Sequence, residues 1–312
     1  MPKSQEKKVY NFMRLRLAAM TMSGLLIVLS IWSLAVNQLN FGLDFTGGTL
    51  IEVGYEKPAD LNNIRSVMVA SGYEDAVVVQ FGSEQDVLIR MQRGFTDTLG
   101  EEVLTTLRNN IAQDDRIELR RVEFVGPQVG DELRDQGGLA MLAALGIIMI
   151  YIALRFQFKF SVGAVAALAH DVIITLGFFS FFQVNFDLTV LAALLAVIGY
   201  SLNDTIVVAD RIRENFRKMR KTDPVTVINT ALTDTLSRTL VTSLTTVMVL
   251  LALFFYGGEI IHSFAEALLL GVVIGTYSSI YVAASILLTM GISHEDLIVE
   301  VVKEGEYVDD LP

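Results

Sequence analysis

Apolar residues gather into six long blocks along the chain, separated by short polar segments. The blocks span about residues 17–36, 138–156, 162–182, 188–208, 239–256 and 265–290. A helix needs about 20 mostly apolar residues to cross the hydrocarbon core of a bilayer. The pattern therefore predicts a polytopic α-helical membrane protein with six transmembrane helices, the last of them long enough to tilt.

The segment between the first two blocks, residues 37–136, has the pattern of a folded aqueous domain. Residues 49–55, 76–81, 87–91 and 116–125 are β-rich, with a turn at 82–86 between the second and third runs. Helical patterns occupy residues 58–71 and 98–112. The order β-α-β-β-α-β predicts one ferredoxin-like α/β domain on a split βαβ plan.

Positive charge is distributed unevenly around the predicted spans. The basic residues of the N-terminus (1–16) and of two loops lie on one side, and they are Lys3, Lys7, Lys8, Arg14, Arg16, Arg155, Lys159, Arg211, Arg213, Arg217, Lys218, Arg220 and Lys221. The opposite loops, 183–187 and 257–263, contain no Lys or Arg. By the positive-inside rule we expect both termini in the cytoplasm and the α/β domain in the periplasm. Because the first block lacks a clear cleavage site, we interpret it as an uncleaved span.

Two segments on the cytoplasmic side have their own patterns. Residues 224–238, inside the bundle region 137–292, start at Asp223-Pro224 and place Val225, Ile228, Leu232 and Leu236 on one face. That pattern predicts an amphipathic helix lying along the cytoplasmic surface. The tail, residues 293–312, is acidic and is predicted to be a solvated end.

Composition narrows the class of function. The chain contains no cysteine, which excludes disulfides and thiolate metal sites, and its net charge of −11 argues against nucleic acid as a partner. Its three histidines, at positions 170, 262 and 294, are scattered, and P-loop, H-E-x-x-H and G-x-S-x-G motifs are missing. We therefore expect no enzymatic site, metal or cofactor. Energy for any work would come from outside the chain or across the membrane.

The fourth span turns polar while still at membrane depth, at residues 199–205. An ionised carboxylate inside a span costs at least about 2.5–3.5 kcal/mol, so Asp204 is a functional-site hypothesis by default. Tyr200 and Asn203 share its helical face.

Arg238 begins the fifth span at a depth similar to that of Asp204. We predict that the two form a pair in which the carboxylate takes up and releases a proton, while the guanidinium, which stays charged, modulates it by moving. The alternative is a static ion pair that only fixes helix packing.

Hydroxyl residues on the fifth and sixth spans accompany this pair. Thr242, Thr245 and Thr246 lie on the same helical face as Arg238, and Ser278 and Ser279 lie on a small, polar strip of the sixth span. Such hydroxyls can hold a water chain leading to Asp204. They are equally consistent with close helix packing, for which residues 271–275 are a G-x-x-x-G signal.

His170 and Asp171 lie near the middle of the third span. They form a second candidate proton relay, or a structural hydrogen bond to a neighbouring helix. Because adjacent helical residues point about 100° apart, we expect no tight bond between the two side chains.

Glycine-rich segments flank the aqueous domain where it joins the spans. They contain Asp44, Gly47 and Gly48 on one side and Gly126 and Pro127 on the other. Glycine allows unusual φ and close backbone approach, whereas proline stiffens the chain. The segments are either shaped connectors or a hinge that couples the membrane part to the domain.

Several long motifs resemble one known family along nearly the whole chain. The chain is similar to the SecF branch of the SecD/SecF family of bacterial protein-export membrane proteins, within the RND superfamily. The matching motifs are Gly42–Gly48, Phe124–Gly130, Ala169–Val172, Ile198–Asn215, Thr235–Thr246 and Gly271–Val282.

The resemblance implies a role and a set of partners. Members act in the bacterial inner membrane with SecD, in association with the SecYEG channel and often YajC. They use the proton-motive force to assist late translocation, after the SecA motor. In the family, the positions of Asp204 and Arg238 are linked to proton flow, and the export-side domain engages or responds to the emerging preprotein.

Two rival functions stay open at this point. One is a subunit of a proton-coupled small-molecule exporter of the RND type, although the aqueous domain is small for a substrate-binding porter domain. The other is a passive assembly factor of the translocon, in which Asp204 and Arg238 only hold helices together.

Overall fold

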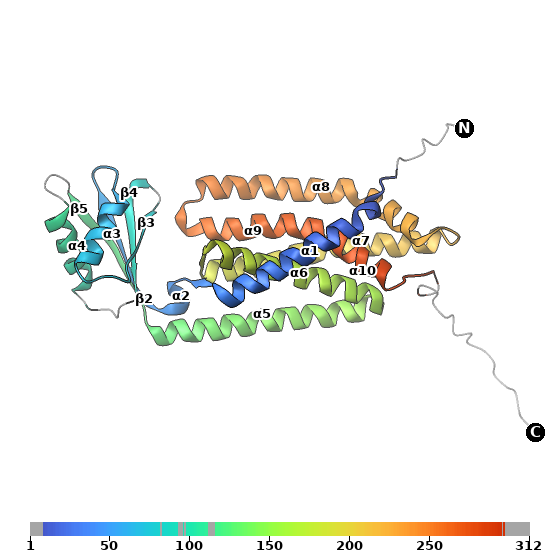
Figure 1. Cartoon of the computed structure of the whole chain (residues 1–312), viewed down its shortest axis with the longest axis horizontal. Coiled ribbons are helices and arrows are strands. Elements are labelled where there is room, and N and C mark those ends of the chain that lie inside the picture. Colours follow the sequence, from blue (N-terminus) through green and yellow to red (C-terminus); the bar gives the residue numbers. More distant parts are fainter. Residues whose placement is uncertain are drawn as a thin grey trace, which may run out of the picture.

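The protein has a small α/β domain at one end of an elongated helix bundle (Figure 1). The computed structural model describes residues 9–81, 83–92, 96, 98–111, 116–294 and 296. The first and last described residues lie at the end of the bundle away from the α/β domain (Figure 1). Residues 1–8 of the predicted cytoplasmic N-terminus, and residues 295 and 297–312 of the tail predicted to be a solvated end, lie outside the described residues.

The described residues contain six helices long and apolar enough to cross a membrane, as predicted. They are η1 with α1 (Phe12–Leu15 and Arg16–Val36), α5 (Pro127–Arg155), α6 (Phe158–Phe182), α7 (Leu188–Lys218), α8 (Pro224–Tyr256), and α9 (Glu259–Ser278) with its continuation. The last helix continues through a π-helical turn, η2 (Ser279–Ala283), into α10 (Ala284–Thr289).

Capping residues define where these helices begin. The Asp187 carboxylate accepts a hydrogen bond from the backbone N–H of Val190 at the start of α7. The Asp223 carboxylate does the same for Val225 at the start of α8, where Pro224 occupies the first turn. Both match the preference of helix N-termini for acidic caps.

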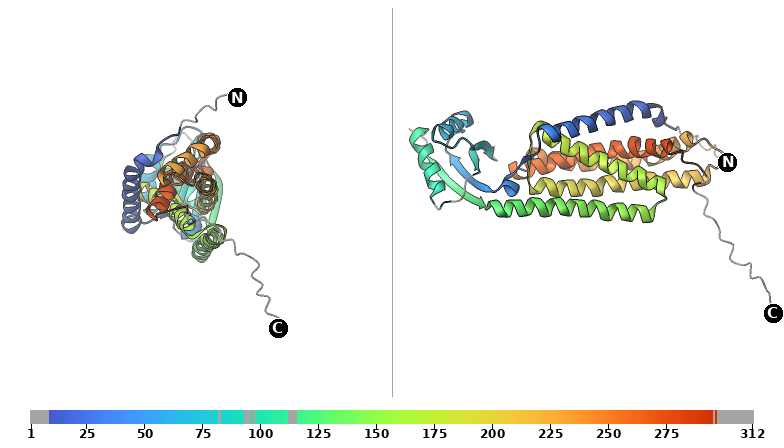
Figure 2. Two further views of the ribbon diagram at one scale, coloured as in Figure 1. Left: turned by 90° about the vertical axis from the view of Figure 1, so that its right-hand side faces the viewer. Right: turned by 60° about the horizontal axis from the view of Figure 1, so that its bottom comes forward.

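The helices differ strongly in how much of their surface the bundle buries. About half or more of the apolar window is buried in α6 (61%) and α7 (50%), but only 6% in α5 and 17% in α8. α1 and α5 lie at the outer edges of the bundle (Figure 2). The centre is therefore formed by α6, α7 and α9, and the outer faces of α5 and α8 are left for lipid or for another protein.

Residues 224–238 do not form a separate surface helix, contrary to our expectation. They are the first part of α8, which continues without interruption to Tyr256. No Gly or Pro follows Pro224 until Gly257, so nothing breaks the helix. Ile228 and Leu232 are buried in the bundle with Ile212 of α7 and Met13 of η1. The apolar face therefore packs on protein.

The first residues of the tail are also held by the bundle. Lys159 donates to the Asp296 carboxylate over 2.7 Å, and His294 contacts the carbonyl oxygens of Phe216 and Thr222. Burial acts to raise the pKa of Asp296, but hydrogen bonds from Lys159 and Ser293 outweigh it and lower that pKa.

The α/β domain has the predicted order of elements. They are β2 (Gly48–Tyr55), α3 (Leu61–Ala70), β3 (Val77–Phe81), β4 (Ser83–Met91), α4 (Leu99–Asn110) and β5 (Ile117–Val125). The strand order is β3-β4-β2-β5, with every neighbouring pair antiparallel. This is the ferredoxin-like arrangement. The turn between β3 and β4 is tighter than predicted, because Phe81 already pairs with Ser83.

Short elements tie the domain to the bundle. After α1, β1 (Asn40–Phe41) pairs in parallel with β6 (Asn185–Phe186), which lies between α6 and α7. β5 leads directly into α5 (Figure 1). Arg90 of β4 donates to the side-chain oxygen of Asn185 over 2.7 Å, across a cleft of about 470 Å³ between the sheet and this end of the bundle.

Candidate functional site

Asp204 lies inside the bundle where three helices meet. Its side chain belongs to α7 and is 8% exposed. Thr239 of α8 donates to Oδ1 over 2.8 Å, and Ser279 of η2 donates to Oδ2 over 3.0 Å. Two hydroxyl donors therefore hold the carboxylate, one on each oxygen.

The expected pair between Asp204 and Arg238 is not formed in this structure. Arg238 is exposed and makes no ion pair with any residue that the structure describes. The physical reason is the rotation of α8 about its axis. Its inward position is Thr239, and the neighbouring side chain points about 100° away.

The same rotation turns the predicted hydroxyls of α8 away from Asp204, with Thr242 and Thr245 exposed and Thr246 half-buried. Thr242, Thr245 and Thr246 donate to carbonyl oxygens of their own helix, and Asn203 of α7 is exposed. Thr242 and Asn203 therefore lie with Arg238 on the exposed surface of the bundle.

A different hydroxyl cluster faces inward above Asp204. Ser243 of α8 is buried and lies 2.7 Å from the Thr276 hydroxyl of α9. Tyr200 of α7 donates to Ser243 over 3.4 Å. Of the predicted supporting residues, Tyr200 thus contacts this inward cluster and Ser279 contacts Asp204 itself.

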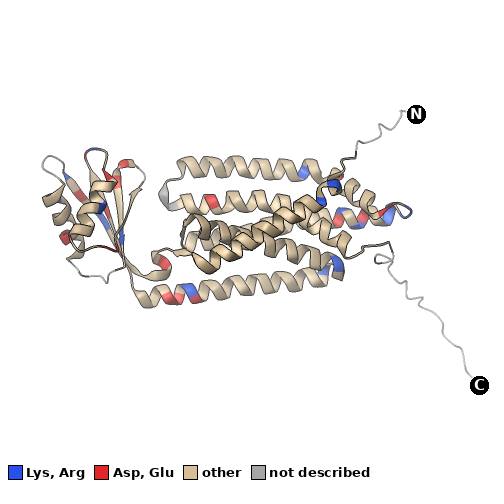
Figure 3. Cartoon of the chain, viewed as in Figure 1, with Lys and Arg blue, Asp and Glu red and all other residues tan. Residues whose placement is uncertain are grey.

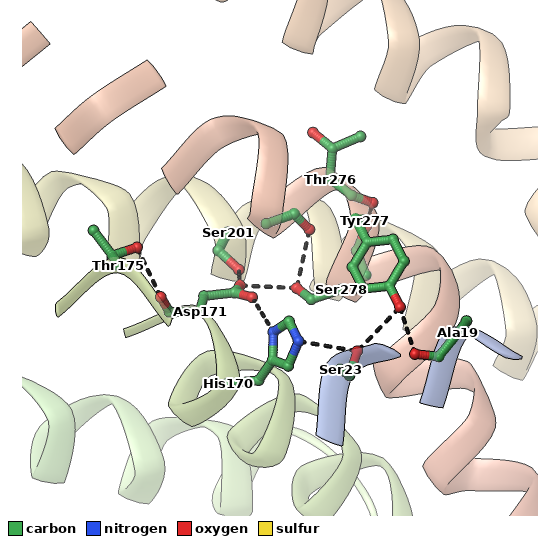
Figure 4. Close-up of polar contacts among 11 residues, drawn as sticks. Ala19, Ser23, His170, Asp171, Thr175, Ser201, Thr276, Tyr277 and Ser278 are labelled. Carbon is green, nitrogen blue, oxygen red and sulfur yellow. Dashed lines mark hydrogen bonds and ion pairs between the residues drawn. The ribbon is translucent and has the colours of Figure 1, made fainter. Parts of the chain in front are cut away.

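His170 and Asp171 form a second buried polar site in α6 (Figure 4). They are 2% and 0% exposed, and His170 Nδ1 lies 2.9 Å from Asp171 Oδ1. Our expectation that adjacent side chains cannot bond tightly is therefore wrong. The 100° separation describes the directions of the Cα–Cβ bonds, and the longer side chains bend toward each other beyond Cβ.

Three other helices supply partners to this second site. Asp171 Oδ2 accepts hydrogen bonds from Ser201 of α7 and from Ser278 of α9, the latter over 2.8 Å. His170 Nε2 lies 3.1 Å from the Ser23 hydroxyl of α1, which lies 3.0 Å from Tyr277. Predicted as a neighbour of Asp204, Ser278 instead belongs to the site of Asp171 (Figure 4).

The two glycine segments that flank the domain contact each other. Gly47 has φ of +68°, and a Cβ built there would lie 2.7 Å from the Cα of Pro127. A Cβ on Gly130 would lie 2.8 Å from the backbone nitrogen of Gly47. Gly48 follows with φ of +128°, and Gly126 caps α5. Gly47, Pro127 and Gly130 therefore form a close-packed joint between domain and bundle, whereas a Cβ on Gly48 would meet β4 within the domain at Met91.

Asp44 makes a contact that the sequence pattern around it did not indicate. It lies in the short helix α2 (Leu43–Thr46), and its carboxylate accepts from the backbone N–H of Leu188 over 3.0 Å. With Asp187, it places a second carboxylate at the N-terminus of α7, where the helix dipole favours negative charge. The joint is thereby attached to the helix that carries Asp204.

Some polar residues of the bundle were not singled out from the sequence. Thr239, Ser201 and Ser23 are partners of the buried carboxylates or of His170. The sequence signal that could have indicated them is a hydroxyl residue within an apolar block.

Glu266 is a half-buried carboxylate inside α9, one turn after His262, whose ring lies 4.0 Å from that of Phe254. An acidic residue in an apolar block was a usable signal. Among the described residues, no cluster of three metal-ligating side chains occurs.

Two family descriptions match the chain. Residues 84–293 match "Protein export membrane protein SecD/SecF, C-terminal", and residues 32–59 match "SecD/SecF GG Motif". The second match contains Gly47 and Gly48, and the first contains both buried carboxylates.

Curated relatives are similar over almost the full length. The chain is 52% identical over 310 residues to the protein translocase subunit SecF of Vibrio alginolyticus, covering 98% of each chain. It is 53% identical over 302 residues to the subunit of the same name from Pseudomonas aeruginosa, covering 97% of each.

Solved structures of SecDF have the same fold. The chain matches crystal structures of SecDF from Thermus thermophilus, a translocon-associated membrane protein, and of SecDF in a super-membrane-facing form. The TM-scores are 0.82 and 0.69, each at 34% identity. In both cases 93% of this chain is covered, but it spans only 40% of the SecDF chain. The length, order and identity of these matches show that the chain belongs to the SecD/SecF family of protein-export membrane proteins, in its SecF branch.

Proposed function

We propose that this chain couples the proton-motive force to late steps of protein translocation and release at the bacterial inner membrane. The observation that carries the proposal is Asp204, a carboxylate buried at the junction of α7, α8 and η2 and held by hydroxyls. Ionisable groups inside spans are rare and mark ion or proton pathways. The proton is the coupling ion, and no other cofactor enters the proposal. The names of the curated relatives, protein translocase subunits, favour protein over small molecules as the cargo.

The energy available to one proton is sufficient for such a role. A charge that moves down a potential of 100 mV releases about 2.3 kcal/mol. A two-state equilibrium responds to a ligand only through its different affinity for the two states. Protonation of Asp204 therefore biases a movement of the helices if the hydroxyls of Thr239 and Ser279 bind one charge state of Asp204 better than the other.

We infer that Arg238 takes part in the proton coupling when α8 rotates about its axis. Thr239 and Arg238 are consecutive, so a turn of about 100° about the helix axis would exchange them beside Asp204. The low burial of α8 leaves it freer to turn than α6 or α7. We propose that the present arrangement, with Thr239 inward, alternates with one in which the guanidinium faces the carboxylate.

The exposed polar residues support an obligate partner, which we propose is SecD. Arg238 and Thr242 of α8 and Asn203 of α7 are exposed in the isolated chain. Polar groups facing lipid are costly, so a second helical half is expected to cover them. The 40% share of the SecDF chain that this chain spans leaves room for that half.

The distribution of charge supports an orientation. Lys and Arg of the bundle concentrate at the end away from the α/β domain (Figure 3). By the positive-inside rule, that end and both termini are cytoplasmic, and the α/β domain is periplasmic. From there the domain meets the translocating preprotein as it leaves the SecYEG channel, with YajC as a further membrane partner and SecA acting earlier on the cytoplasmic side.

The first test is the Asp204→Asn substitution in reconstituted vesicles with SecD. Asparagine keeps the size, its oxygen still accepts from one hydroxyl, and its NH₂ can donate to Ser279, whose own proton can turn to the carbonyl of Thr276. Because asparagine cannot titrate, we expect loss of proton flux and loss of proton-driven export. Asp135→Asn is the matched control, because Asp135 is an exposed carboxylate in α5. Wild-type flux and export in the Asp204→Asn protein, at normal protein level, would overturn the proposal and favour a passive assembly role.

A further inference from the structure

We propose that His170 and Asp171 form a second proton-binding site. In the arrangement seen here it holds one proton more than a neutral histidine beside an ionised aspartate, and it is linked to Asp204 through Ser278 and Ser279. The inference rests on the proton coupling proposed above. It assigns a charge state and a mechanical connection to a site for which the sequence left relay and structural bond open.

The direction of each hydrogen bond can be followed from one end of the network. Tyr277 donates its single hydroxyl proton to the carbonyl oxygen of Ala19 over 2.7 Å. Its oxygen therefore accepts from Ser23. Because a serine hydroxyl has one proton, Ser23 in turn accepts from His170. Nε2 of His170 therefore carries a proton, as follows from the contacts drawn as dashed lines in Figure 4.

The bond between His170 and Asp171 then requires one more proton. Nδ1 and Oδ1 lie 2.9 Å apart, so one of the two atoms is the donor. Either the imidazolium donates to a carboxylate, or a protonated carboxyl donates to a neutral imidazole. Both forms contain the same number of protons and have no net charge. The pair therefore holds two protons, one on Nε2 and one shared between Nδ1 and Oδ1, which is one more than a neutral histidine beside an ionised aspartate would hold.

Without that proton the contact cannot persist. Two lone pairs would face each other across 2.9 Å, and the carboxylate would carry an uncompensated charge in a residue that is 0% exposed. Loss of the proton to water must therefore be accompanied by movement of a side chain or a helix. Proton binding at this site is thus connected to the conformation of α6.

The surroundings offer no fixed charge to replace the proton, as far as the described residues show. α1 faces the pair with Ser23, α7 with Ser201, and α9 with Ser278 and the titratable Tyr277. The neighbouring surfaces of α5 and α10 are apolar, with Leu145 and Ile148 from α5 and Ile286 from α10. Along α7, the first ionisable residue after Ser201 is Asp204, about one turn further on.

Consecutive serines connect the two carboxylates. Ser278 donates to Asp171 and Ser279 donates to Asp204, and the π-helical turn begins at Ser279. π-turns are rare and occur frequently at functional sites. Each serine also has an alternative acceptor in its own helix, the carbonyl of Gly275 or of Thr276. A shift at this turn therefore changes the hydrogen bonds of both carboxylates together.

Asp171→Asn gives the decisive variant, because its amide mimics the protonated state. The amide oxygen accepts from Ser201 and Ser278, and the amide NH₂ donates to Nδ1 of neutral His170. We expect normal protein level and thermal stability but loss of proton flux in vesicles with SecD. Infrared difference spectra should also lose the signal of a group that titrates at this site. Wild-type flux together with an unchanged spectrum would show that the pair is structural.

Ser278→Ala tests the connection separately. It removes one donor to Asp171 and leaves both carboxylates in place, and we expect it to change the pH profile of Asp204-dependent flux. Ser285→Ala is the matched control, since Ser285 is buried in α10 and its hydroxyl has no hydrogen-bond partner among the described residues. Equal profiles for the two variants would overturn the connection. If Asp204→Asn abolishes flux while Asp171→Asn does not, this inference fails and the proposed function stands.

Discussion

At the residue scale, the important property of Asp204 is the neutrality of its nearest partners. A carboxylate beside a guanidinium is stabilised in its charged form, whereas hydroxyls serve both the charged and the protonated form. Thr239 and Ser279 donate to the carboxylate in the arrangement seen here, which suits its charged form, and they can reorient to suit the protonated form that the proposed function requires. An Arg238 held permanently beside Asp204 would favour only the charged form.

The first residue-scale prediction concerns Thr239→Val, which keeps the shape but removes the hydroxyl. A hydrogen bond to a charged group is worth about 1.5–3 kcal/mol. We expect the charged form of Asp204 to lose that support, so that proton flux falls while the protein level stays normal. Thr230→Val is the control, because Thr230 donates only to the carbonyl of Thr226 in its own helix. Equal flux in the two variants would exclude a role for Thr239.

At the element scale, helical spacing in the sequence predicted which residues share a face but not which face turns inward. Arg238 and Thr242 do lie on one side of α8, yet that side is exposed. The rotation of a helix is determined by packing with its neighbours, here Ser243 against Thr276. The six spans and the order of the α/β elements depend on local periodicity, and these were predictable. The bond between His170 and Asp171 depends on rotamers, which spacing does not encode.

An element-scale prediction concerns the joint between the domain and α5. Gly47→Ala introduces a Cβ at φ of +68° and against Pro127, whereas Gly72→Ala introduces one at φ of +85° into open space. Both substitutions place a side chain at positive φ, which is strained, and Gly47, with ψ of 175°, lies in a region that is essentially restricted to glycine. We therefore expect a larger drop in thermal stability, and a loss of export, only for Gly47→Ala. Equal effects would show that the contact with Pro127 is unimportant.

At the scale of the whole molecule, the bundle has two unlike outer faces. Much of the outer surface of α5 consists of large apolar residues, and Ile147, for example, is 68% exposed. The outer surface of α8 also contains Arg238 and Thr242. α5 and α8 lie on opposite sides of the bundle (Figure 1). This asymmetry suits lipid on one side and a protein partner on the other.

The chain contains no cysteine, so a cysteine introduced by substitution is its single thiol. Thr242→Cys adds a single thiol one turn after Arg238 on the outer face of α8, and Ile147→Cys adds one to the apolar outer face of α5. In membranes that contain SecD with single cysteines placed along its spans, we expect disulfide cross-links from position 242 and none from position 147. Cross-links from α5 alone would place SecD on the other side of the bundle. In that case a partner other than SecD would have to cover Arg238 and Thr242.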